Sequence, residues 1–184
     1  MVATRLMTAE DLEAMGPKAE KRFELIDGVL VEADGVGGRH GGVNTDIVFA
    51  LTGYTRPRKL GRVFSADTRF ILHRDPDLVQ MPDVSFIRAE RIPPGGLWES
   101  SIPIPPDLAT EIASPNDTAA EVRRKAHRYL DAGVRLVWIV WPERRAVSVF
   151  RAGEAELWLT ENDELDGGDV IPGFRLPIAS IFAD

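Results

Sequence analysis

Residues 107–115, DLATEIASP, are the segment from which the architecture of this chain can be predicted. Their apolar and small side chains predict a short buried strand, and the serine–proline pair predicts a break before a helix. Glu111 lies inside this strand. Burying a carboxylate is costly unless it is paired or bound to a metal ion, so Glu111 is the first candidate for a functional residue.

The helix that follows is marked by its own sequence signals. Thr118 and Glu121 have the spacing of a capping box, which opens a helix, and Gly133 suits a helix end after about Asp131. An acid at a strand end facing a lysine on the next helix can support catalysis. The predicted helix carries four basic residues: Arg123, Arg124, Lys125 and Arg128.

The rest of the chain alternates short strands, turns and helices. A capped helix is predicted at residues 8–15, an Asp-Gly hairpin at 23–32, a glycine-rich connector at 35–42 with His40, and then a helix at 42–56. Further strands are predicted at 62–66, 68–72, 81–87, 135–141, 146–151 and 155–160, with 135–141 central because it is apolar throughout. The segments at 146–151 and 155–160 alternate as an antiparallel pair, and the chain shows no internal repeat or linker.

Composition and charge bound the class of protein. A chain of 184 residues that is 44% hydrophobic suits one domain spanning 1–184, and its lack of cysteine excludes disulfides and thiolate catalysis. We expect a soluble cytoplasmic protein, because no signal peptide or membrane span of ~20 apolar residues is recognisable. A net charge of −7 argues against non-specific coating of nucleic acid, although an enzyme depends on the local charge at its site.

Three acids and one lysine are best considered together. Glu24, Asp83 and Glu111 lie on or beside predicted apolar strands, where clustered carboxylates raise one another's pKa. A divalent cation reverses that cost because hard cations prefer oxygen ligands. Glu24 and Asp83 also have ordinary explanations: Glu24 could occupy a solvent-facing strand position, and Asp83 could be a turn residue. Lys125 could pair with Glu121 on the surface of the helix.

An ordered series of short motifs resembles one protein family. The series is FELIDG at 23–28, PDV at 82–84, EIASP at 111–115, and Lys125 followed by YLDAGV at 129–134, with PGF at 172–174 near the end. Over residues 8–182 it is similar to the Uma-type family of restriction-endonuclease-like proteins, part of the PD-(D/E)xK nuclease superfamily. Each motif is weak by itself, whereas the ordered set is fairly specific.

The resemblance implies an α/β fold: a mixed α+β sheet with flanking helices and antiparallel hairpins around a restriction-endonuclease-like core. It also implies a metal-dependent phosphodiesterase site. Asp83 and Glu111 correspond to the motif aspartate and glutamate and would bind Mg²⁺ or Mn²⁺, with Glu24 as an additional ligand. The superfamily's motif lysine is expected two residues after the glutamate, where this chain has Ala113. The family supplies the lysine from the following helix instead, which here is Lys125.

The resemblance also implies partners. The substrate would be nucleic acid, with DNA favoured, and a homodimer is expected because nucleases of this superfamily often pair. His40 lies where a histidine is common in the family. Arg123, Arg124 and Arg128 are candidate contacts to phosphates, although a solvated helix face explains them equally well.

Two other functions remain compatible with the sequence. The fold could be a catalytically silent nucleic-acid-binding or regulatory module, which the acidic net charge mildly favours. Glycoside hydrolysis by two carboxylates fits less well, because it has no need for the lysine. The sequence also offers no obvious aromatic platform for a sugar beyond Trp98.

Overall fold

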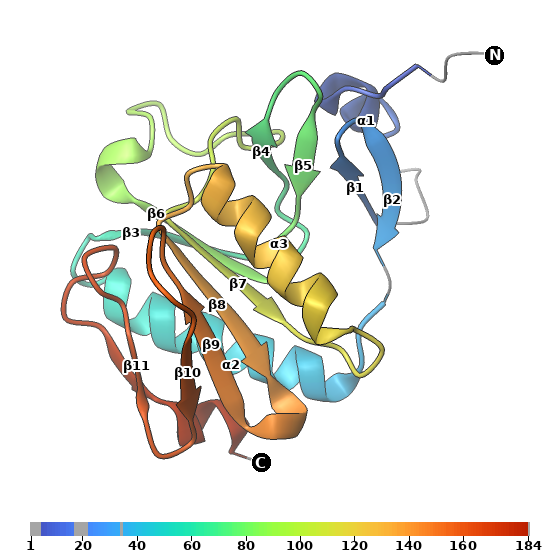
Figure 1. The fold of residues 1–184 in the computed structure, drawn as a ribbon. Helices are drawn as coiled ribbons and strands as arrows, with labels where there is room; N and C mark the ends of the chain where they lie inside the picture. The colour runs from blue at the N-terminus through green and yellow to red at the C-terminus, as the bar shows by residue number, and fades with distance from the viewer. Residues whose placement is uncertain (1–4, 17–21, 34, 184) are drawn as a thin grey trace.

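The structure is a computed structural model that describes residues 5–16, 22–33 and 35–183. Its centre is a six-stranded sheet with the strand order β10-β9-β8-β7-β6-β3 (Figure 1). Only β7 and β8 pair in parallel, and the other neighbours in this sheet are antiparallel. The strands are β3 (Gly61–Ser65), β6 (Val84–Arg88), β7 (Leu108–Ile112), β8 (Leu136–Trp141), β9 (Ala146–Phe150) and β10 (Leu157–Thr160).

A second, four-stranded sheet lies beside helix α1 (Ala9–Ala14) and has the order β2-β1-β5-β4. All of its strand pairs are antiparallel. Its strands are β1 (Arg22–Ile26), β2 (Val29–Ala33), β4 (Phe70–His73) and β5 (Leu78–Gln80). The C-terminal part adds the antiparallel pair β11 (Glu164–Asp166) and β12 (Arg175–Pro177). The 3₁₀ turns of the described residues are η1 (Ala89–Arg91), η2 (Pro142–Arg144) and η3 (Ile178–Phe182).

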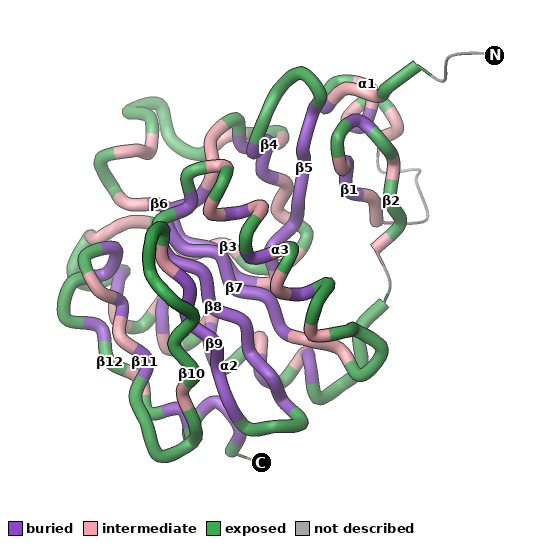
Figure 2. Tube along the Cα trace, in the orientation of Figure 1, coloured by how far each residue is buried: buried purple, intermediate pink, exposed green. Residues whose placement is uncertain are grey.

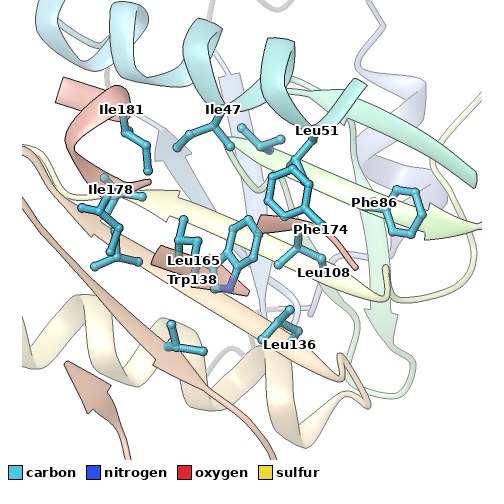
Figure 3. Close-up of a cluster of buried hydrophobic side chains, with 14 of the residues drawn as sticks. Ile47, Leu51, Phe86, Leu108, Leu136, Trp138, Leu165, Phe174, Ile178 and Ile181 are labelled. Atoms are coloured by element: carbon cyan, nitrogen blue, oxygen red, sulfur yellow. The ribbon is translucent and has the colours of Figure 1, made fainter. Parts of the chain in front are cut away.

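Two longer helices cover opposite faces of the six-stranded sheet, as Figure 1 shows. Helix α2 (Gly38–Thr55) packs Ile47 and Leu51 against one face, where Trp138 and Phe174 fill the core (Figure 3). Helix α3 (Ala119–Asp131) crosses from β7 to the parallel β8 and buries Val122, Ala126 and Tyr129 against the other face. Among the described residues, no helix is long and apolar enough to cross a membrane.

The local signals in the sequence correctly predicted several elements. Thr118 and Glu121 form both hydrogen bonds of the capping box on α3, and Gly133 follows its C-cap with a φ of +93°. The turn of the β1–β2 hairpin consists of Asp27 and Gly28, both with positive φ, as an Asp-Gly turn requires. Strand β8 is buried along its whole length, and Figure 2 shows it among the buried central strands. The predicted mixed α+β sheet is therefore confirmed.

Two parts of the prediction were wrong. Strand β5 was missed because its three residues are too short for a periodic signal, and only pairing with β1 and β4 identifies it. Helix α2 begins at Gly38, so His40 lies in its first turn and not before it. The glycines disfavour a helix, but His40 and Asn44 both bond to Asp83, and these tertiary contacts outweigh the weak local propensity.

Candidate active site

Strand pairing and the β7–α3–β8 crossover bring the four candidate residues together. In the register of β6 against β7, Val84 lies opposite Thr110, so continuing one residue further places Asp83 opposite Glu111. Glu24 belongs to β1 of the smaller sheet, and its side chain is buried. Lys125 lies on the buried side of α3 between Val122 and Tyr129, with about a fifth of its side chain exposed (22%).

Lys125 connects two of the carboxylates. Its Nζ lies 3.0 Å from Oε1 of Glu111 and 3.4 Å from Oε1 of Glu24. Burial would lower the pKa of Lys125, but the negative charges of Glu111 and Glu24 outweigh burial and raise it above the ordinary value. Lys125 therefore stays protonated and acts as the cation of this cluster.

Glu111 has the most perturbed environment of the three acids. Tyr129 donates its hydroxyl hydrogen to Oε1 of Glu111 at 2.5 Å. Burial raises the pKa of Glu111 to about 7, the Lys125 charge opposes that rise, and the charges of Asp83 and Glu24 add to it. The pKa of Tyr129 is raised well above its ordinary value, first by burial and then by Glu111, so the phenol remains a donor. Glu111 is thus a carboxyl whose protonation changes near neutral pH.

Asp83 is held by backbone and side-chain donors. Its Oδ2 accepts hydrogen bonds from the backbone N–H of Ile112 at 2.8 Å and from Nε2 of His40 at 3.1 Å. Asn44 donates to the Asp83 carbonyl oxygen at 2.8 Å. Burial would lower the pKa of His40, but its hydrogen bond and charge interaction with Asp83, joined by the Glu111 charge, raise it.

His40 therefore has a structural partner in the site, as a hydrogen-bond donor to Asp83. Asn44 was missed at the sequence level, although its spacing of four residues from His40 puts both side chains on one face of a helix. Tyr129 appears in the sequence only within the YLDAGV motif, and its hydrogen bond to Glu111 depends on how α3 packs on β7.

Two hollows lie on the surface near these elements, and Glu111 lines the smaller one. One, of about 180 Å³, is lined by Glu111, Lys125 and Arg128 together with the start of α3. A larger hollow, of about 580 Å³, is lined by Arg22, Met81 and other residues around the four-stranded sheet. Arg22 and Met81 each precede a candidate acid by two residues, but none of the candidate acids lines this larger hollow.

The three candidate arginines of α3 have different surroundings. Arg123 bonds Glu156 through Nε and an Nη nitrogen, at 2.8 and 3.0 Å, and is therefore engaged with the β9–β10 side of the molecule. Arg124 is exposed on the helix surface, and Arg128 lines the smaller hollow beside Lys125. Arg128 is thus the arginine of this set that the structure brings to the site.

The donor set suits a hard divalent cation chemically. Asp83, Glu24 and Glu111 offer carboxylate oxygens. The pKa of Glu111 is raised first by burial and then by the charges of Asp83 and Glu24, and a bound cation would relieve both costs. Across the part of the chain that the structure describes, no three His, Cys, Asp or Glu side chains are already arranged as a metal cluster. In this structure, the ammonium of Lys125 compensates Glu111 and Glu24 instead.

Comparison with known proteins identifies the class to which this fold belongs. The structure resembles a crystal structure described as "a putative nuclease belonging to DUF820" from Anabaena variabilis, with a TM-score of 0.83 and 22% sequence identity. The similarity covers 96% of this chain and 97% of the other, so the two chains share the same fold.

The sequence identifies the family itself. The model of the Uma2 family, described as "Putative restriction endonuclease", matches residues 9–179. The chain therefore belongs to the Uma2 family, and the resemblance inferred from its motifs is confirmed. No curated protein matches the sequence.

Proposed function

We propose that this protein is a metal-dependent nuclease that hydrolyses phosphodiester bonds of nucleic acid, with DNA as the favoured substrate. The observation that supports it most is the position of Lys125. Its Nζ lies between the carboxylates of Glu111 and Glu24, at 3.0 and 3.4 Å, beside Asp83 on the neighbouring strand. The nuclease-like fold and the Uma2 family membership agree with this assignment.

Asp83, Glu111 and Glu24 would hold Mg²⁺ or Mn²⁺. When bound, such an ion lowers the pKa of a water molecule and stabilises negative charge on phosphate oxygens. The chain's own contribution is to orient the ligands: the Ile112 N–H and His40 hold Asp83, and Tyr129 holds Glu111.

Lys125 would bind the reacting phosphate and orient the attacking water. Its raised pKa favours a permanently charged hydrogen-bond donor over a general base. A fixed positive charge at this point would stabilise the charge that develops on the phosphate in the transition state. Arg128, which lines the same hollow, would contact a phosphate of the bound strand.

Assembly and location belong to the same proposal. We propose a homodimer on the basis of the family resemblance, with one domain per chain and a cytoplasmic location, as the sequence predicts. Sedimentation equilibrium would measure the dimer directly, and a concentration-independent monomer mass would contradict it.

The first test is calorimetric titration of the protein with Mn²⁺. The wild type should bind, whereas Asp83→Ala and Glu111→Ala should each abolish binding while remaining folded by circular dichroism. Asp169→Ala is the matched control, because this exposed acid pairs with Arg135 on the surface. No binding by a folded wild type would contradict the metal site.

Cleavage is then tested on single- and double-stranded DNA and RNA with Mg²⁺ or Mn²⁺. Cleavage that needs the metal and both acids supports the nuclease. Metal-independent binding of nucleic acid without cleavage would support a catalytically silent module on the same fold.

A further inference from the structure

Gln80 is a buried polar residue for which the proposed chemistry has no role. It is the last residue of β5, and none of its surface is exposed (0%). Neither Oε1 nor Nε2 has a hydrogen-bond partner within residues 5–16, 22–33 and 35–183. A buried amide without partners is destabilising, so a fold that keeps one calls for an explanation.

The register of the smaller sheet places Gln80 beside the candidate site. Leu25 of β1 pairs with Val79 of β5, and continuing this antiparallel register by one residue puts Glu24 opposite Gln80. Directly opposed residues have Cβ atoms roughly 5 Å apart. Because Leu25 and Val79 both face the cluster beside α1, Glu24 and Gln80 face the other way. Phe70, which pairs with Gln80 on β4, belongs to the core beneath α3.

The hydrogen bonds of Glu24 show what such a neighbour could supply. Oε1 of Glu24 accepts from the backbone N–H of Met81 at 2.8 Å and from Nζ of Lys125 at 3.4 Å. Lys125 is shared with Glu111 and is closer to it. If Lys125 turns to a phosphate, Glu24 loses its only described cationic partner, while the amide of Gln80 still has two hydrogens to donate.

We propose that Gln80 is a positioning residue for Glu24. Its side-chain amide donates a hydrogen bond to the Glu24 carboxylate when Lys125 leaves that carboxylate for a bound phosphate. In the structure Lys125 donates to Oε1 of Glu24, and the amide of Gln80 has no hydrogen-bond partner among the described residues. This role rests on the proposed function, since it assumes that Lys125 engages the substrate.

The direct test is a double-mutant cycle on thermal stability, without metal or nucleic acid. Gln80→Met keeps the length of the side chain and removes its polar atoms. In the wild-type background it should leave the melting temperature unchanged or raise it by about 2–4 °C, because an unsatisfied amide is lost. With Lys125→Met, Glu24 is free to accept from Gln80, so Gln80→Met should lower the melting temperature.

Thr110→Val is the matched control for this cycle. Thr110 is equally buried (0%) and its Oγ1 also lacks a hydrogen-bond partner among the described residues, but it lies on β7 among residues that face α2. Its effect on the melting temperature should be the same with and without Lys125. An equal loss of stability for Gln80→Met in both backgrounds would show an ordinary structural role and overturn the proposal.

A titration with Mn²⁺ gives a second measurement that does not require the Lys125 variant to fold. With a non-hydrolysable phosphorothioate DNA duplex present, so that Lys125 is engaged by phosphate, Gln80→Met in the otherwise wild-type protein should weaken Mn²⁺ binding about 10-fold, as loss of a residue that orients a ligand does. An unchanged affinity overturns the proposal for Gln80 and leaves the nuclease proposal intact. If the wild type binds no Mn²⁺ but the stability cycle shows the expected coupling, the metal site fails and the role of Gln80 is supported.

Discussion

Asp77 and Glu111 are both buried carboxylates, but their surroundings shift their pKa values in opposite directions. Asp77 lies in the turn between β4 and β5, where its oxygens accept from the backbone N–H of Ala9 at 2.8 Å and of Asp75 at 3.3 Å. Arg74 donates to it at 2.8 Å. Burial alone would raise the pKa of Asp77, but these hydrogen bonds and the Arg74 charge lower it.

Glu111 has a similarly small exposed surface but lies deeper among protein atoms, and its pKa is raised to about 7, first by burial. Its donors are the side chains of Tyr129 and Lys125, and the latter is shared with Glu24. The nearby charges of Asp83 and Glu24 oppose its ionisation. The difference shows that Asp77 is placed to hold α1 on the sheet, whereas the acids around Glu111 carry a stability cost of the kind found at functional sites.

Among the substitutions considered, replacing Lys125 should have the largest effect on nucleic-acid cleavage. Lys125→Ala should keep Mn²⁺ affinity within about threefold and reduce cleavage at least ~100-fold, because the phosphate loses a fixed positive charge in the transition state. Arg124→Ala, a change in the exposed neighbour on α3, should retain cleavage. Single-turnover cleavage assays measure both variants, and unchanged cleavage by Lys125→Ala would remove it from the mechanism.

The pH dependence of stability should separate the two carboxylates. Because the pKa of Glu111 rises from 4.5 to about 7 on folding, its contribution is fully present below pH 4.5 and is lost as the pH rises through 7. The free energy of unfolding should therefore fall by up to about 3 kcal/mol across this range. Urea unfolding between pH 4.5 and 8 measures this change.

Glu111→Gln should flatten that pH profile, because the amide does not titrate. The pH dependence contributed by Asp77 has the opposite sign. Because its pKa is lowered, Asp77 stabilises the fold at pH values above its ordinary pKa of 3.8, and this stabilisation is lost as the pH falls through the folded pKa. Asp77→Asn should therefore leave the profile between pH 4.5 and 8 unchanged. A wild-type profile identical to that of Glu111→Gln would contradict the raised pKa.

Replacing the Asp77 carboxylate should change the stability of the fold and leave metal binding unchanged. Asp77→Asn should cost about 2 kcal/mol, because the backbone and Arg74 donors lose a charged acceptor. The expected fall in melting temperature is about 4–8 °C by calorimetry. Mn²⁺ binding should remain that of the wild type, and a loss of metal affinity would show that the two regions are coupled.

The smallest effect is expected from the arginines of α3. In a plot of the logarithm of nucleic-acid affinity against the logarithm of salt concentration, Arg128→Ala should reduce the slope by about one. Loss of one phosphate contact has this effect. Arg123→Ala should leave that slope unchanged, because Arg123 is bonded to Glu156. Binding measured by fluorescence anisotropy at several salt concentrations tests the pair, and equal slopes for both variants would contradict the assignment.

Much of the fold was predictable because its signals are local. The capping box of α3, the Asp-Gly turn and the apolar β8 each depend on residues a few positions apart, and each prediction was confirmed. The start of α2 and the short strand β5 were not predictable in this way. Both depend on partners that are distant in sequence: Asp83 for α2, and β1 and β4 for β5.

The sequence by itself determined the family, through its ordered motifs, and the residue types available for a metal-dependent site. Only the tertiary structure decided which of them meet. Lys125 lies 101 residues from Glu24 along the chain, yet their side chains are 3.4 Å apart, while Arg123 on the same helix contacts Glu156. Burial and Coulomb interactions depend on distance in space, so the raised pKa of Glu111 arises only in the folded chain. The same holds for the buried amide of Gln80, which has no partner among the described residues.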